Sequence, residues 1–180
     1  MIKSSLIYLF FSGLFFVLNQ LNAQELLFDH GEIEFYTATT ISDIEAITEE
    51  ASIKLDVKTG NVDIAVNIKS FDFEYELMET HFNREYMESD KFPQATFKGK
   101  IIQDISGDFE VMDVDVSGDL TIHGVTRKID VKAQITKSQD YVLVKAKMPV
   151  VFENYNIEEP TILTKAVAKS VEVKSTLYLK

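Results

Sequence analysis

The stretch IKLDVKTGNVDIAVNIK, residues 53–69, decides the fold class. Apolar and polar side chains alternate along it, on both sides of the turn residues Thr59-Gly60-Asn61. Because successive side chains of a β-strand point to opposite faces, each half reads as a strand with one apolar and one polar face. Two such runs separated by a short glycine-containing turn predict an antiparallel β-hairpin.

The same alternation recurs along most of the chain. A second hairpin is predicted from residues 128–135 and 142–148, joined at Ser138-Gln139-Asp140. Further strands are expected at residues 32–37, 95–103, 109–122 and 171–179, which brings the total to about eight. One-sided strands in this number favour a closed antiparallel β-barrel, because closure removes both sheet edges and turns every apolar face inward. A two-sheet sandwich satisfies the same alternation and stays open as the alternative.

Residues 73–89 break the alternating pattern and predict an amphipathic helix of about four turns. Apolar residues recur there at spacings of three and four: Leu77, Met78, Phe82, Tyr86 and Met87. The helix is expected to end before Phe92-Pro93, since the residue before a proline disfavours helix. Seven acidic residues lie between Asp72 and Asp90 against Arg84 alone, which indicates a solvated face or a docking surface for a basic partner. A second, short helix is considered near residues 162–168.

Composition excludes several classes of protein. With 180 residues and 46% hydrophobic content, the chain suits one globular domain. The absence of cysteine excludes disulfide frameworks, zinc ribbons, cysteine nucleophiles and a cysteine-linked lipid anchor. With 29 acidic and 18 basic residues, the net charge of -11 argues against binding to nucleic acid or to an anionic membrane surface.

The first 23 residues predict a signal peptide. Lys3 precedes an apolar run over residues 6–18, and Leu21-Asn22-Ala23 ends on the small residue required for cleavage after Ala23. The run is too short to span a bilayer comfortably, which leaves an uncleaved anchor as the weaker alternative. We therefore expect export, with residues 24–180 forming a single domain that has no stable membrane span.

The inward-facing positions of the strands are the candidate binding residues. They are Ile53, Leu55, Val57, Val62, Ile64, Val66, Phe97, Ile122, Ile129, Val131, Val144 and Met148. No charge interrupts this set in the two hairpins, so a cavity there would accept a hydrocarbon and reject a polar metabolite. From alternation alone, a barrel filled by these side chains is an equal alternative.

Catalytic and metal-binding motifs are not evident in the sequence, and no catalytic residue, metal or cofactor is predicted. His81 and Glu85 lie one helical turn apart but have no evident third ligand. His123, between two predicted strands, either bonds backbone at a tight turn or holds a polar headgroup at the pore mouth. With Met78, Phe82 and Tyr86 it forms the predicted mouth or lid.

Three motifs resemble the YceI-like family of exported bacterial proteins. GDLTIHGVTR (residues 118–127) is similar to a family signature, and METHFNREYMESDKFPQATFKG (residues 78–99) resembles its helix-to-strand segment in the form common in Bacteroidetes members. NYNI (residues 154–157) with Pro160 resembles the closing element of the family, with Asn154 in place of an aspartate. A glycine-rich feature expected after the first strand is replaced by residues 42–47.

The resemblance implies a lipocalin-like barrel whose apolar pore binds a polyisoprenoid, a quinone-type molecule or another long-chain lipid. It also implies a periplasmic or secreted protein without catalytic activity, which transports or stores the lipid. Two alternatives from other classes stay open: an envelope interaction module with a filled barrel and an acidic docking helix, and a hydrolase or isomerase built around His81 or His123. A homodimer is also left open.

Overall fold

The structure is a computed structural model that describes residues 25–38, 43–158 and 169–180. The predicted signal peptide and the helix considered near residues 162–168 therefore lie outside the described residues. Within the described ranges, no helix is long and apolar enough to cross a membrane.

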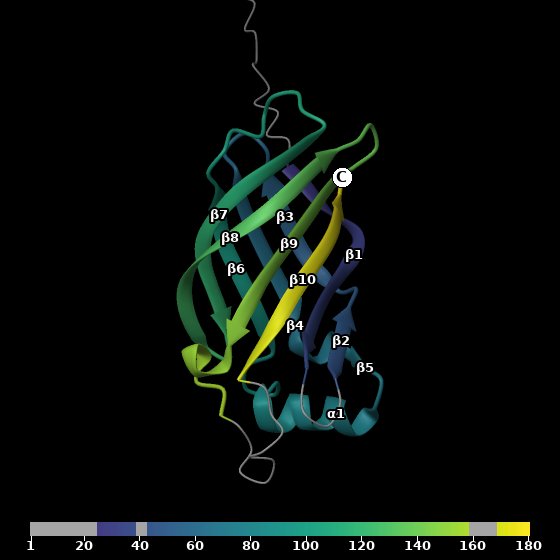
Figure 1. Cartoon of the computed structure of the whole chain (residues 1–180), viewed down its shortest axis with the longest axis vertical. Coiled ribbons are helices and arrows are strands. Elements are labelled where there is room, and N and C mark those ends of the chain that lie inside the picture. The colour runs from purple at the N-terminus through teal and green to yellow at the C-terminus, as the bar shows by residue number, and fades with distance from the viewer. Residues whose placement is uncertain (1–24, 39–42, 159–168) are drawn as a thin grey trace, which may run out of the picture.

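Eight antiparallel strands close into a barrel (Figure 1). They are β1 (Glu25–Thr37), β3 (Ala51–Asp56), β4 (Asn61–Asn67), β6 (Gln94–Ile101), β7 (Val111–Ile122), β8 (Val125–Lys137), β9 (Val142–Val151) and β10 (Ser170–Leu179). Neighbouring strands follow this order, and β10 pairs with β1 to complete the ring. The predicted closed barrel is confirmed, and the sandwich alternative is wrong.

The quoted stretch folds as the expected hairpin. Strands β3 and β4 pair with Leu55 opposite Val62 and Ile53 opposite Ile64, so that the apolar residues share the inner face. Gly60 adopts a φ of +73° in the connecting turn, a conformation that costs glycine little. Backbone N–H groups of Thr59 and Lys58 donate to the Asp56 carboxylate and hold its pKa below the ordinary value.

Strand β1 is shared between the barrel and a small extension. Its first residues pair with β3, whereas residues 33–37 pair with β2 (Ile44–Thr48). Strand β2 in turn pairs with β5 (Asp72–Phe73). Within the described part of the atypical segment, residues 44–47 belong to β2 and thus extend the sheet beside the helical end of the barrel (Figure 1).

The predicted helix is present but shorter than expected. It consists of α1 (Glu76–His81) and a π-helical turn, η2 (Phe82–Tyr86). Phe73 belongs to the sheet instead, because its backbone pairs with Ala46 in β2. In η2 the N–H of Met87 donates to the Phe82 carbonyl at 2.9 Å, five residues back. Short 3-10 turns, η1 (Ile68–Ser70) and η3 (Phe152–Tyr155), lie at the same end of the barrel.

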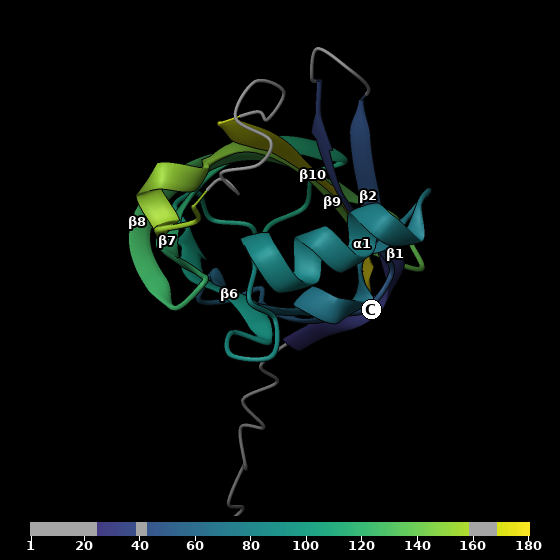
Figure 2. The ribbon, with the colours of Figure 1, turned by 90° about the horizontal axis from the view of Figure 1, so that it is seen from below.

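The barrel has two different ends. At the closed end, Leu55, Ile135 and Leu179 are each about 1% exposed. The β6–β7 loop covers this end with the buried Ile105, and Lys137 Nζ donates to the carbonyl oxygens of Ile105 and Gly107 at 2.9 and 2.6 Å. The opposite end, which we call the mouth, is covered by α1 and the turns η1, η2 and η3, and seen from below the helical segment crosses it (Figure 2).

Candidate functional site

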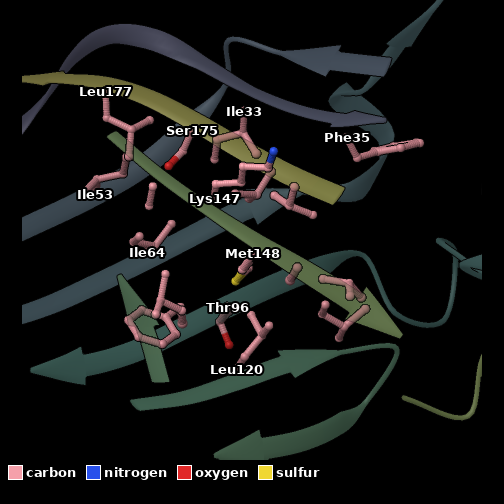
Figure 3. A pocket seen from close by; sticks show the side chains of 18 of the residues that line it. Ile33, Phe35, Ile53, Ile64, Thr96, Leu120, Lys147, Met148, Ser175 and Leu177 are labelled. Carbon is pink, nitrogen blue, oxygen red and sulfur yellow. The ribbon is translucent and has the colours of Figure 1, made fainter. Parts of the chain in front are cut away.

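A cavity of about 260 Å³ lies inside the barrel and is lined from all eight barrel strands (Figure 3). Its lining is apolar except at Tyr86, Thr96, Lys147 and Ser175, whose side chains carry a polar group. Two of these exceptions belong to the outer face. Thr96 pairs across the sheet with Thr121, and the Thr121 hydroxyl lies on the outer face, 2.8 Å from that of Thr126. Lys147 Nζ lies 2.7 Å from Glu172 Oε2, also on the outer face. The part of the lumen that the structure describes therefore presents no charged group.

Most of the predicted pore residues line this cavity. They are Ile53, Leu55, Val62, Ile64, Val66, Phe97, Ile122, Val131, Val144 and Met148. Val57 packs in the main core instead, just beyond the last residue of β3, and Ile129 packs against the cluster of buried residues at the mouth. The strand alternation thus brings together ten of the twelve residues, and their contact with a lipid stays a prediction.

Several lining residues were not among the predicted set. Strand β10 contributes the inward row Val171, Val173, Ser175, Leu177 and Leu179. Its alternation is visible in the sequence apart from Ser175, a polar residue at an apolar position. Ala133 and Ala146 were also missed, because alanine is a weak signal of an inward face.

Two glycines shape the wall beside Phe97. Gly99 and Gly118 pair directly across β6 and β7. A Cβ built on Gly99 would lie 2.5 Å from the Phe97 ring, and one on Gly118 would lie 2.8 Å from it. The ring therefore occupies the space that two side chains would otherwise fill. This keeps Phe97 close to the barrel wall.

An aromatic cluster packs at the mouth. The Phe82 ring contacts those of Phe35, Phe71 and Phe73, with centroid separations between 5.1 and 5.9 Å. The Tyr86 ring lies 6.2 Å from that of Phe152. Phe82 and Tyr86 both line the cavity, whereas Met78 is partly exposed and does not. A role of these residues as a mouth or lid for a ligand stays a prediction.

His123 links three segments at the mouth. Its Nε2 lies 3.0 Å from Glu88 Oε2, and its Nδ1 lies 3.3 Å from the carbonyl oxygen of Tyr155. The ring also packs edge-on against Phe92, with centroids 4.4 Å apart. With a φ of +50° and a side chain only 10% exposed, His123 ties the β7–β8 turn to the segments after η2 and in η3. It does not line the cavity.

The titratable residues offer little for catalysis or metal binding. His81 Nδ1 lies 3.0 Å from Glu85 Oε1, an ion-pair distance without hydrogen-bond geometry. The described ranges hold no group of three or more histidine or acidic side chains placed to bind a metal ion. The site is therefore characterised by its apolar volume.

Comparison with known proteins agrees with this architecture. The family model described as YceI-like domain matches residues 25–179. Protein YceI of Escherichia coli is 30% identical over 80 residues, a match that spans 44% of this chain and only 39% of that relative.

Two solved structures share the fold. A polyisoprenoid binding domain from Saccharophagus degradans, implicated in plant cell wall breakdown, has a TM-score of 0.74 at 17% identity, covering 87% of this chain and 97% of that one. BcnA of Burkholderia cenocepacia has a TM-score of 0.69 at 19% identity, covering 84% and 98%. The family match spans the whole barrel, from the first residue of β1 to the last of β10, and on this ground the chain belongs to the YceI-like domain family.

Proposed function

We propose that this protein binds the chain of an apolar lipid inside its barrel. The observation that carries the proposal is a cavity lined from eight strands by hydrocarbon side chains, with no charged group facing it among the described residues. Such a lining excludes solutes whose polar groups would be left unpaired, and it retains a hydrocarbon by removing it from water. The polyisoprenoid binding that names the Saccharophagus degradans relative supports this class of ligand.

The size of the cavity bears on the length of chain. An engineered apolar cavity of roughly 150 Å³ accepts benzene, so about 260 Å³ holds on the order of ten carbon atoms. At about 0.8 kcal/mol per buried CH2 group, this would contribute about 8 kcal/mol before the costs of immobilising the ligand. A longer polyisoprenoid or a quinone tail would continue past Phe82 and Tyr86 at the mouth.

The finer parts of the proposal concern location and role. We infer an exported, periplasmic or secreted protein that carries or stores the lipid and catalyses no reaction. The apparent signal peptide supports export, and the apolar character of the site supports a binding role. The opposing hypothesis of a filled barrel is not supported by the cavity, although a basic partner for the acidic helix stays a prediction.

The test uses protein purified after export. Native mass spectrometry measures the mass of the intact complex, and a separate sample is extracted with organic solvent to identify any bound lipid. We expect a bound apolar lipid, and we expect the delipidated protein to regain thermal stability when an isoprenoid alcohol or quinone is added. The proposal is contradicted if no lipid co-purifies with the protein and no added ligand stabilises it.

A further inference from the structure

Ser175 places a hydroxyl group on the inner face of the barrel. It lies in the middle of β10, in the inward row with Val173 and Leu177, and it lines the cavity. Across the sheet it pairs with Ala146 of β9 and Ile33 of β1. Figure 3 shows it beside Ile33 and Leu177 in the hydrocarbon wall.

Among the described residues, this hydroxyl has no hydrogen-bond partner. A buried water needs two to four polar partners to be held well. With Ser175 as its neighbour and hydrocarbon around it, a water there would be poorly held and easily displaced. A hydroxyl without a partner is thus available to a ligand.

We propose that Ser175 hydrogen-bonds an uncharged oxygen of the bound lipid, so that the ligand carries a hydroxyl or carbonyl group within the barrel. This inference rests on the proposed function and names the class of ligand more closely. Ser175 then acts as a specificity-determining residue of the lipid site.

The surroundings favour an uncharged oxygen over a phosphate or a carboxylate. The one ammonium group associated with the cavity wall, that of Lys147, is paired with Glu172 on the outer face and 61% exposed. A charged headgroup at the level of Ser175 would lose its hydration without gaining an ion pair, which disfavours its burial there. A hydroxyl or carbonyl group needs only the hydrogen bond that Ser175 can donate or accept.

Small neighbours leave room for such a group. Ala133 of β8 pairs with Ala146, and Ala146 pairs with Ser175, so three adjacent strands carry short side chains at one level. On the strands beyond, this level is bordered by larger residues such as Ile33. The space over the three short side chains is therefore where a polar group of the chain would meet the Ser175 hydroxyl.

The test compares dodecan-1-ol with dodecane as competitors of the neutral fluorescent probe N-phenyl-1-naphthylamine. The ratio of the two affinities is measured in the wild-type protein and in Ser175→Ala, Ser175→Thr and Ser117→Ala. Ser117 lies on the outer face of β7 and serves as the matched control. We expect Ser175→Ala to reduce the preference for the alcohol about three- to tenfold, with Ser175→Thr retaining it and Ser117→Ala leaving it unchanged.

The outcomes separate this inference from the proposed function. If both ligands bind and the ratio is the same in Ser175→Ala as in wild type, the hydroxyl is not a ligand contact and the inference is overturned, while lipid binding stands. If neither ligand displaces the probe from the wild-type protein, the proposed function fails and this inference fails with it. If Ser175→Thr loses the preference as fully as Ser175→Ala, the hydroxyl is not the determinant.

Discussion

The closed end and the mouth of the barrel follow the same alternation but pack their inward residues in different ways. At the closed end, Leu55, Ile135 and Leu179 line the inner part of the cavity and are almost inaccessible to solvent. Toward the mouth, Met148 and Val173 line the cavity and stay partly exposed. Alternation therefore determines which residues face inward, whereas the covering segments determine how far each part of the cavity wall is shielded from solvent.

The largest expected effect contrasts one residue from each region. Leu55→Ala removes a fully enclosed side chain and should lower the free energy of unfolding by about 2–5 kcal/mol. Met148→Ala should cost less than about 2 kcal/mol, since this side chain is already partly exposed to solvent whereas Leu55 is not. Urea unfolding of both variants measures the difference, and equal losses would show that the two regions are packed alike.

The glycine pair beside Phe97 gives the next effect. Gly99→Ala should destabilise the protein by about 1–3 kcal/mol, because the new Cβ would meet the Phe97 ring at 2.5 Å. Adding Phe97→Leu should restore part of this loss in a double-mutant cycle.

Gly118→Ala supplies the matched control for that cycle. Its Cβ would also lie 2.5 Å from the Gly99 Cα and from the carbonyl oxygen of Lys98, which a smaller residue 97 does not relieve. We expect Phe97→Leu to rescue Gly99→Ala and to leave Gly118→Ala largely unrescued. Equal rescue of both would mean that the ring, and not the backbone, limits space at Gly118.

A smaller effect is expected at His123, and it should be confined to the mouth. His123→Ala removes the contacts of the imidazole with Glu88 and with the Tyr155 carbonyl, at a cost of about 1 kcal/mol. Hydrogen exchange should quicken at residues 85–90 and 152–156 and stay unchanged around Leu55 and Leu179. A uniform increase over the barrel would contradict a role restricted to the mouth.

The smallest effect depends on pH. Burial raises the pKa of Tyr155 above its ordinary value of 10.0. Since the unfolded chain ionises this tyrosine first, its neutral form favours the folded state, and stability is full below about pH 10 and falls as pH rises above it. Tyr155→Phe should reduce the loss of stability between pH 9 and pH 11. Identical pH profiles for the two proteins would show that Tyr155 is not responsible.

The barrel could be predicted because its signal is local. In residues 53–69 and 128–148, alternation and turn composition alone specify two hairpins, and the inward residues follow from them. The π-turn after His81 and the strand Asp72–Phe73 could not be predicted in this way, because packing of Met87 and pairing with β2 are long-range contacts.

The site was predictable in kind but not in volume. The sequence indicates apolar inward faces, but whether they leave a cavity depends on which small residues lie side by side in the register. Ala133 and Ala146 are adjacent only because β8 and β9 pair as they do. Ser175 was missed for a related reason, since a serine in an apolar row carries no sign of facing inward until its strand is placed.

The central claim is that the cavity holds the lipid, and a matched pair of variants tests it most directly. Ala146→Leu adds three carbon atoms inside the cavity, whereas Ala65→Leu adds the same group on the outer face of β4, opposite Thr96. The measurement is the affinity of each variant for N-phenyl-1-naphthylamine and for dodecan-1-ol. We predict a loss of about tenfold or more for Ala146→Leu and a change of less than about twofold for Ala65→Leu. Equal affinities in the two variants would contradict binding inside the barrel.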